Sequence, residues 1–247
     1  MATTSTSLAA RSFGPVGSPR APVVVLPGLA VSRYLRAGCA SLADRTRRRV
    51  LLVEPPGFGA NAGALPGRVT LGRVADALAP WLATLGPVLL VGQSTGCLLA
   101  ARVARGSVGL EVEELGLVSP TFDPTRASLP GTAGRLLLDG RHEPWWLGPV
   151  EVPEWARNAR GLPRYLLSCL REPLEEHLDD VRCPVVVTRG DRDPLSRHEW
   201  VASLTDRPHR TLVTVPGGGH TYMAANPVAL AASLAAGGFA GSEGASA

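Results

Sequence analysis

Short runs of apolar residues, most of them followed closely by glycine or proline, recur along most of the chain and constrain its fold more than any other feature. Apolar runs of this length, without alternating polar residues, are typical of strands that are covered on both faces, as in a parallel sheet. We therefore predict buried strands at residues 23–26, 50–53, 88–91, 115–118, 185–188 and 211–215.

Helical spacing of apolar residues fills most of the gaps between these strands. We expect helices at about residues 34–46, 71–85, 95–105, 197–205 and 227–236. Regular alternation of strand and helix predicts the α/β class, in the form of a three-layer α/β/α sandwich around a mostly parallel sheet.

The alternation stops between residues 122 and 182, where prolines and tryptophans dominate the first half and a pair of helical patterns the second. A connection of this length is uncommon in a compact domain. We therefore predict a helical cap or lid, residues 122–182, inserted over the sheet edge into an α/β core formed by residues 21–121 and 183–236. Residues 1–20 are expected to form a flexible lead-in and residues 237–247 a disordered tail.

Composition and charge exclude several classes of protein. The net charge is +4 and every basic residue is an arginine. The cluster of Arg45, Arg47, Arg48 and Arg49 has no interleaved aromatic residues, so we interpret it as a solvated face and expect no nucleic-acid partner. The cysteines lack paired spacing, and we expect no cofactor and no metal site. With no signal-peptide pattern in the first 20 residues and no apolar stretch of membrane-span length, the sequence predicts a cytoplasmic protein.

The stretch around Ser94 takes a buried strand through Gly-Gln-Ser-Thr-Gly into a helix of small and apolar residues. Ligands of open parallel sheets bind beyond the carboxyl ends of the strands, where Ser94 lies. A sharp strand-to-helix turn strains the serine backbone and presses together the residues two positions away, so Gly92 and Gly96 fit it. A Gly-x-Ser-x-Gly match is weak by itself, but this context favours a nucleophile over a packing turn.

A serine nucleophile needs a base, and His220 is the best placed of the histidines. It follows a predicted strand on a triple-glycine loop, beyond the same edge of the sheet as Ser94. The other histidines fall in the insertion or in surface positions: His142, His177, His198 and His209.

The carboxylate that orients the base is expected at a third strand end. Asp191 and Asp193 both follow the predicted strand at 185–188, and we favour Asp193, with Asp191 expected to lie in a turn. Asp123, after the strand at 115–118, is a further candidate.

The loop after the first predicted strand supplies the remaining requirement, an oxyanion site. Pro27-Gly28 lets the backbone pass close to the serine, and Pro27 has no N–H to donate. We therefore expect the backbone N–H groups of Leu29 and Thr95 to form the oxyanion hole.

Together these segments resemble the α/β-hydrolase family over nearly the whole chain. The resemblance rests on "LPGLA", "EPPGFGAN", "GQSTG", "GDRDP" and "GGGH", in the family's order of nucleophile, acid and base. It departs from the family at Pro27-Gly28, where His-Gly is common, and at Glu54, where aspartate is usual. The amino-terminal antiparallel strands of the family are not evident.

The resemblance implies a serine esterase or lipase-like hydrolase that forms an acyl-enzyme on an ester or thioester of a small apolar or aromatic acyl substrate. Trp145, Trp146 and Trp155 of the insertion are candidates for an apolar lid over the substrate, with simple packing as the equal alternative. The same residues also fit a carbon–carbon bond hydrolase or a non-hydrolytic lyase or cyclase, and a catalytically idle binding protein is a third hypothesis. Substrates of the second class need a cation, for which the insertion offers Arg126, Arg135, Arg141 and Arg157.

Overall fold

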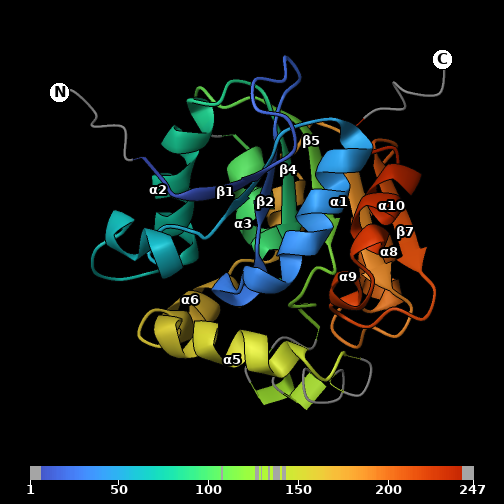
Figure 1. Cartoon of the computed structure of the whole chain (residues 1–247). Coiled ribbons are helices and arrows are strands. Elements are labelled where there is room, and N and C mark those ends of the chain that lie inside the picture. Colours follow the sequence, from blue (N-terminus) through green and yellow to red (C-terminus); the bar gives the residue numbers. More distant parts are fainter. Residues whose placement is uncertain are drawn as a thin grey trace.

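A single twisted sheet forms the centre of the molecule (Figure 1). The computed structural model describes residues 7–106, 108–125, 128, 130–132, 134–135, 140 and 143–240. Within them the strand order is β1-β3-β2-β4-β5-β6-β7, with β1 antiparallel to β3 and every other neighbouring pair parallel. The strands are β1 (Ala10–Phe13), β2 (Val23–Leu26), β3 (Val50–Val53), β4 (Val88–Gln93), β5 (Val112–Val118), β6 (Val185–Gly190) and β7 (Arg210–Val215).

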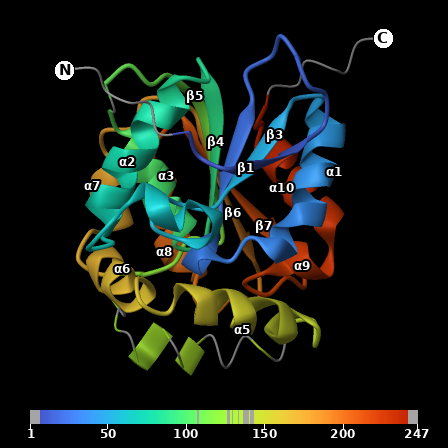
Figure 2. The same ribbon diagram turned by 60° about the vertical axis from the view of Figure 1, so that its left-hand side comes forward.

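Helices cover both faces of this sheet. Seen in Figure 2, α2, α3, α7 and α8 lie on one side and α1, α9 and α10 on the other, which confirms the predicted three-layer α/β fold. The helices are α1 (Arg36–Thr46), α2 (Leu71–Ala83), α3 (Gly96–Ala104), α5 (Leu147–Asn158), α6 (Leu162–Cys169), α7 (Leu174–Leu178), α8 (His198–Leu204), α9 (Tyr222–Ala225) and α10 (Pro227–Ala236). In the described ranges, none of them has the length and hydropathy needed to cross a bilayer.

The continuous apolar runs are explained by two separate cores, one on each face of the sheet. Successive side chains of a strand point to opposite faces. Accordingly, Val24 and Leu26 of β2 pack with α2 and α3, whereas Val23 and Val25 pack with α1 and α10. Both sets are fully buried. A polar residue at any of these four positions would therefore enter a core, and β2 contains none.

The two chain ends differ from the sequence-based expectation. Residues 10–13, expected in a flexible lead-in, form the antiparallel edge strand β1 against β3. Their side chains are mostly exposed, so no apolar run marked this strand. At the other end, Phe239, which was expected in the disordered tail, is buried against the α1 and α10 side of the sheet. Residues 241–247 lie outside the described residues.

Three described helices of the segment between residues 122 and 182 lie in two different places. Helices α5 and α6 lie beyond the carboxyl ends of the strands, beneath the sheet in Figure 2. Helix α7 lies beside α2 and α3 in Figure 2, and its Leu174 and Leu178 are buried in the same core as α3, which α6 also reaches through Tyr165 and Cys169. The part of the predicted insertion that faces the strand ends is therefore shorter than 122–182.

Candidate active site

Ser94 occupies the sharp turn between β4 and α3. Its φ is +54°, a left-handed conformation that is unusual for serine. The two flanking glycines are required by close backbone contact: a Cβ on Gly92 would lie 2.3 Å from the Gly96 oxygen, and one on Gly96 would lie 2.3 Å from the Leu26 oxygen. The turn therefore holds a strained serine above the sheet edge, as its sequence predicts.

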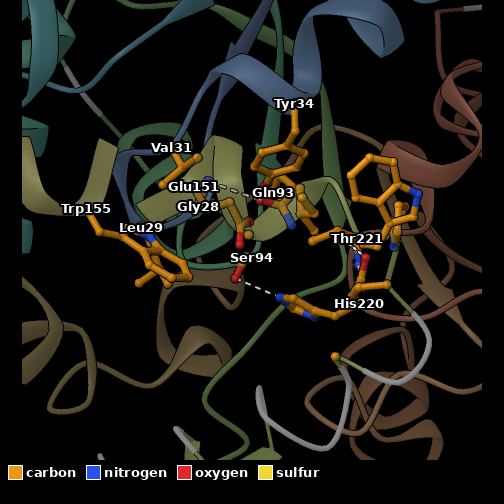
Figure 3. A pocket seen from close by; sticks show the side chains of 16 residues that line it. Gly28, Leu29, Val31, Tyr34, Gln93, Ser94, Glu151, Trp155, His220 and Thr221 are labelled. Atoms are coloured by element: carbon orange, nitrogen blue, oxygen red, sulfur yellow. Dashed lines mark hydrogen bonds between the residues drawn. The ribbon is translucent and has the colours of Figure 1, made fainter. Parts of the chain in front are cut away.

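Three side chains from three strand ends form one chain of hydrogen bonds. His220 Nε2 lies 2.9 Å from Ser94 Oγ, and His220 Nδ1 lies 3.0 Å from Asp193 Oδ2 (Figure 3 shows the Ser94–His220 pair). All three residues are buried, with exposures of 7% for Ser94, 2% for His220 and 3% for Asp193. This is the geometry in which an imidazole can take the proton of a serine hydroxyl while a carboxylate holds its tautomer.

Asp193, not Asp191, is the carboxylate that the fold brings to His220. Its second oxygen accepts hydrogen bonds from the backbone N–H groups of Leu195 at 2.8 Å and Ser196 at 3.0 Å. Burial alone would raise the pKa of Asp193, but the charge of His220 and these hydrogen bonds outweigh it and hold the pKa below its usual value. Asp191 is exposed.

The other candidates for acid and base lie elsewhere. Asp123 is buried, but it pairs with Arg197 at 3.5 Å. Of the histidines that the structure describes, His177 on α7 is buried beside Arg105, which follows the carboxyl-terminal end of α3, and His198 is exposed on α8. His209 precedes β7, and His142 lies outside the described residues.

The expected oxyanion groups approach Ser94 from the loop after β2. A Cβ on Gly28 would lie 2.6 Å from the Ser94 Cβ, so only glycine lets this loop pass so close. Leu29 has a φ of +46°, and its N–H donates to the side-chain oxygen of Thr95 at 2.8 Å. The Leu29 amide therefore already has an acceptor at the position where we expected it to meet the substrate.

A cavity of about 310 Å³ opens beside Ser94 and His220 (Figure 3). Two of the expected lid residues line it, Trp145, which is 89% exposed, and Trp155, which is half-buried. Trp146 is absent from the described lining and packs against the core on the α1 side. The other described lining residues are Gly28, Leu29, Val31, Tyr34, Gln93, Gly140, Glu143, Pro144, Leu147, Gly148, Glu151 and Thr221.

Two glutamates in this lining were not singled out from the sequence. Glu143 accepts hydrogen bonds from the backbone N–H and the hydroxyl of Thr221, next to His220. Glu151, on α5, has a pKa raised to about 7, first by burial and then by the charge of Glu143. No sequence pattern marks Glu151, because its position depends on which face of α5 turns toward the cavity.

The arginines considered for an anionic substrate do not reach the described lining. Arg157 pairs with Glu54 at 3.0 Å, outside the cavity, and Arg135 is not a lining residue. Arg126 and Arg141 lie outside the described residues. In the described part of the chain, no group of three or more His, Cys, Asp or Glu side chains has an arrangement suited to a metal ion.

Solved structures share this architecture at low sequence identity. A thermophilic esterase from Thermogutta terrifontis matches with a TM-score of 0.67 and 21% identity, covering 93% of this chain and 92% of that one. Est816, described as an N-acyl homoserine lactone degrading enzyme, gives 0.70 and 16%, covering 93% and 96%. A bromoperoxidase from Bacillus anthracis gives 0.69 and 18%, covering 92% and 94%. Identities this low show the fold alone.

Sequence comparison identifies the family. A comparison with curated protein sequences found no match. The model of the alpha/beta hydrolase family, in contrast, matches residues 23–233, which include all but one strand of the sheet and all three residues of the Ser94–His220–Asp193 chain. This chain therefore belongs to the alpha/beta hydrolase family.

Proposed function

We propose that the protein is a serine hydrolase that cleaves an ester or thioester through an acyl-enzyme on Ser94. The observation that carries this proposal is the unbroken hydrogen-bonded chain from Ser94 through His220 to Asp193 beside a cavity. Among the similar structures, one is described as an esterase and Est816 as an enzyme that degrades N-acyl homoserine lactones, which supports the proposal.

In the first half of the reaction, Ser94 Oγ attacks the substrate carbonyl carbon while its proton passes to His220 Nε2. Asp193 accepts the Nδ1–H hydrogen bond and stabilises the imidazolium. The tetrahedral intermediate then collapses: the bond to the leaving oxygen or sulfur breaks, and His220 returns the proton to the leaving group. In the second half, His220 deprotonates a water that attacks the acyl-enzyme, and the acid is released with Ser94 restored.

The oxyanion of each intermediate is assigned to the backbone N–H groups of Leu29 and Thr95. The loop carrying Leu29 lies against Ser94, and Thr95 follows it at the start of α3. Donors of this kind act where negative charge develops, and losing one typically costs on the order of a hundredfold in rate. On this assignment, the substrate oxygen takes the place that the Thr95 hydroxyl holds in front of the Leu29 amide.

The cavity supports an acyl substrate over the alternatives. A carbon–carbon bond hydrolase for dioxo acids needs a cation near the substrate carboxylate, whereas the described lining contains Glu143 and Glu151 and no arginine. A catalytically idle binding protein would not need His220 to be hydrogen-bonded to both Ser94 and Asp193. Trp145 and Trp155 are assigned to the apolar wall of the acyl site.

Labelling with a fluorophosphonate probe tests the mechanism directly. We expect a covalent adduct on Ser94 in the wild type and none in Ser94→Ala, together with turnover of p-nitrophenyl esters or acyl-thioesters of graded chain length. An unlabelled Ser94 in folded wild-type protein, with no turnover across the series, would reject the proposal.

A further inference from the structure

Three glutamates of the segment over the strand ends are buried or half-buried, and two of them accept hydrogen bonds from other parts of the chain. Glu154 accepts a hydrogen bond from the Ser32 backbone N–H at 2.7 Å, and Glu143 is bonded to Thr221. Glu151 lies one turn before Glu154 on α5 and lines the cavity. In the part of the chain that the structure describes, its carboxylate has neither a hydrogen bond nor an ion pair. Glu151 is therefore available to a ligand.

The surroundings of Glu151 favour a cation as that ligand. The aromatic residues Tyr34, Trp145 and Trp155 line the same cavity, and aromatic faces attract cations. Although the chain has 25 arginines, none appears in the described lining, where His220 is the one basic side chain. Burial and the neighbouring Glu143 raise the pKa of Glu151 to about 7, against the opposing charge of His220. A cation bound beside Glu151 would favour the charged form of the carboxylate and so offset these effects.

A second polar group in the lining also lacks a partner. Gln93 is only 1% exposed, and its side-chain oxygen accepts hydrogen bonds from the Gly28 N–H at 3.1 Å and the Tyr34 hydroxyl at 2.5 Å. These two donors fix which end of the amide is oxygen. Its Nε2 is buried without a hydrogen-bond partner among the described residues. Burying an unpaired donor is costly, so an acceptor oxygen of a ligand would be stabilised there.

We propose that the cavity takes acyl substrates that carry a protonated or quaternary amine, with Glu151 as the residue that selects the cation. Gln93 Nε2 donates to an oxygen of the same substrate. This inference rests on the proposed function for its chemistry, but the selection of the cation is a property of binding. It can therefore be measured without turnover.

Isosteric ester pairs provide the test, because replacing a quaternary nitrogen by carbon removes the charge and keeps the shape. One pair places the charge in the acyl group: p-nitrophenyl 4-(trimethylammonio)butanoate and p-nitrophenyl 5,5-dimethylhexanoate. The other pair places it in the alcohol: choline phenylacetate and 3,3-dimethylbutyl phenylacetate. The measurement is the ratio of kcat/KM for the charged ester to that for the neutral one, in wild type, Glu151→Gln and the control Glu176→Gln. Glu176 is exposed on α7, so its variant loses the same charge outside the cavity.

For at least one pair, we expect kcat/KM for the charged ester to exceed that for the neutral ester by roughly 10-fold to 100-fold, both in the wild type and in Glu176→Gln. In Glu151→Gln the ratio should fall close to one, because kcat/KM for the charged ester falls more than kcat/KM for the neutral ester. Ratios near one in the wild type, or ratios that Glu151→Gln leaves unchanged, would overturn the inference.

Binding to Ser94→Ala separates this inference from the proposed function. Calorimetric titration of that variant with the same esters should show tighter binding of the charged member, and the preference should disappear when Glu151→Gln is added. If the preference is present while the wild type hydrolyses no ester, the proposed function fails and the cation site stands. If the wild type hydrolyses the esters and neither binding nor hydrolysis shows a preference for the charged member, the proposed function stands and the cation site fails.

Discussion

The backbone N–H of Leu29 donates a hydrogen bond to the side-chain oxygen of Thr95 across 2.8 Å. Leu29 is held in a left-handed conformation, and Thr95, which directly follows Ser94, is buried. The Thr95 hydroxyl thus occupies the acceptor position in front of an amide that we assign to the oxyanion hole. An oxyanion that uses this amide has to displace the hydroxyl.

Replacing Thr95 by valine removes that competitor at nearly constant volume. A neutral hydrogen bond is worth about 1 kcal/mol net, so we expect kcat/KM for p-nitrophenyl butyrate to rise by up to about fivefold. Thr95→Ser retains the hydroxyl and should behave as the wild type. A fall in kcat of tenfold or more in the valine variant, at unchanged KM, would mean instead that the hydroxyl donates to the oxyanion.

Asp193→Asn tests the role of the buried carboxylate. Asparagine keeps the shape but cannot hold the His220 tautomer or its charge, and the loss in comparable serine hydrolases is about 10⁴-fold in kcat. We expect a loss of this order, measured with the same ester. The matched control is Asp191→Asn, since Asp191 is two residues away and exposed. Equal losses in the two variants would contradict the assignment of Asp193.

The fold was predictable because its signals are local. Each parallel strand is an apolar run, and each end of the site lies next to one: Ser94 after β4, Asp193 after β6 and His220 after β7. The carboxyl ends of parallel strands lie at the same edge of a sheet, so residues that follow these strands come together there whatever the rest of the sequence is. The edge strand β1 was missed for the same reason, since its exposed side chains form no apolar run.

The cavity was only partly predictable because it depends on how α5 is placed. Trp145 lines it, whereas Trp146, adjacent in sequence, does not and packs against the core, and Trp155 does both. Glu151 and Glu154 differ in role although they lie on one helix, because only Glu154 meets the Ser32 N–H. Such differences come from the rotation of a helix against loops that are distant in sequence, which no local pattern encodes.

Gly96→Ala tests whether the turn around Ser94 needs its glycines for packing. The added Cβ would lie 2.3 Å from the Leu26 oxygen, a distance that forces β2 and α3 apart. We expect a loss of about 2–4 kcal/mol in the free energy of unfolding, measured by urea denaturation. Gly63→Ala is the control, because a Cβ on Gly63 meets nothing within 4 Å. A similar loss in both variants would show that the effect is not contact-specific.

His177 is a buried histidine that the proposed chemistry does not use. Its Nδ1 lies 2.9 Å from an Arg105 side-chain nitrogen, and its Nε2 lies 3.3 Å from a Glu172 oxygen. Burial, and then the charges of Arg105 and Arg102, lower the pKa of His177 to about 4, despite the opposing effect of Asp180. The folded protein therefore keeps this imidazole neutral at pH values where an unfolded chain protonates it.

This difference lowers the free energy of unfolding when the pH is lowered. Below about pH 6.5 the unfolded state binds a proton at His177 that the folded state does not bind until about pH 4. The contribution of His177 to the free energy of unfolding is thus fully present above pH 6.5. It is lost as the pH falls toward 4, and the loss is on the order of 3 kcal/mol. In His177→Gln, the free energy of unfolding should fall less between about pH 7.5 and pH 4.5 than in the wild type. His198→Gln, which removes an exposed histidine, is the control, and parallel pH curves for His177→Gln and the wild type would contradict the prediction.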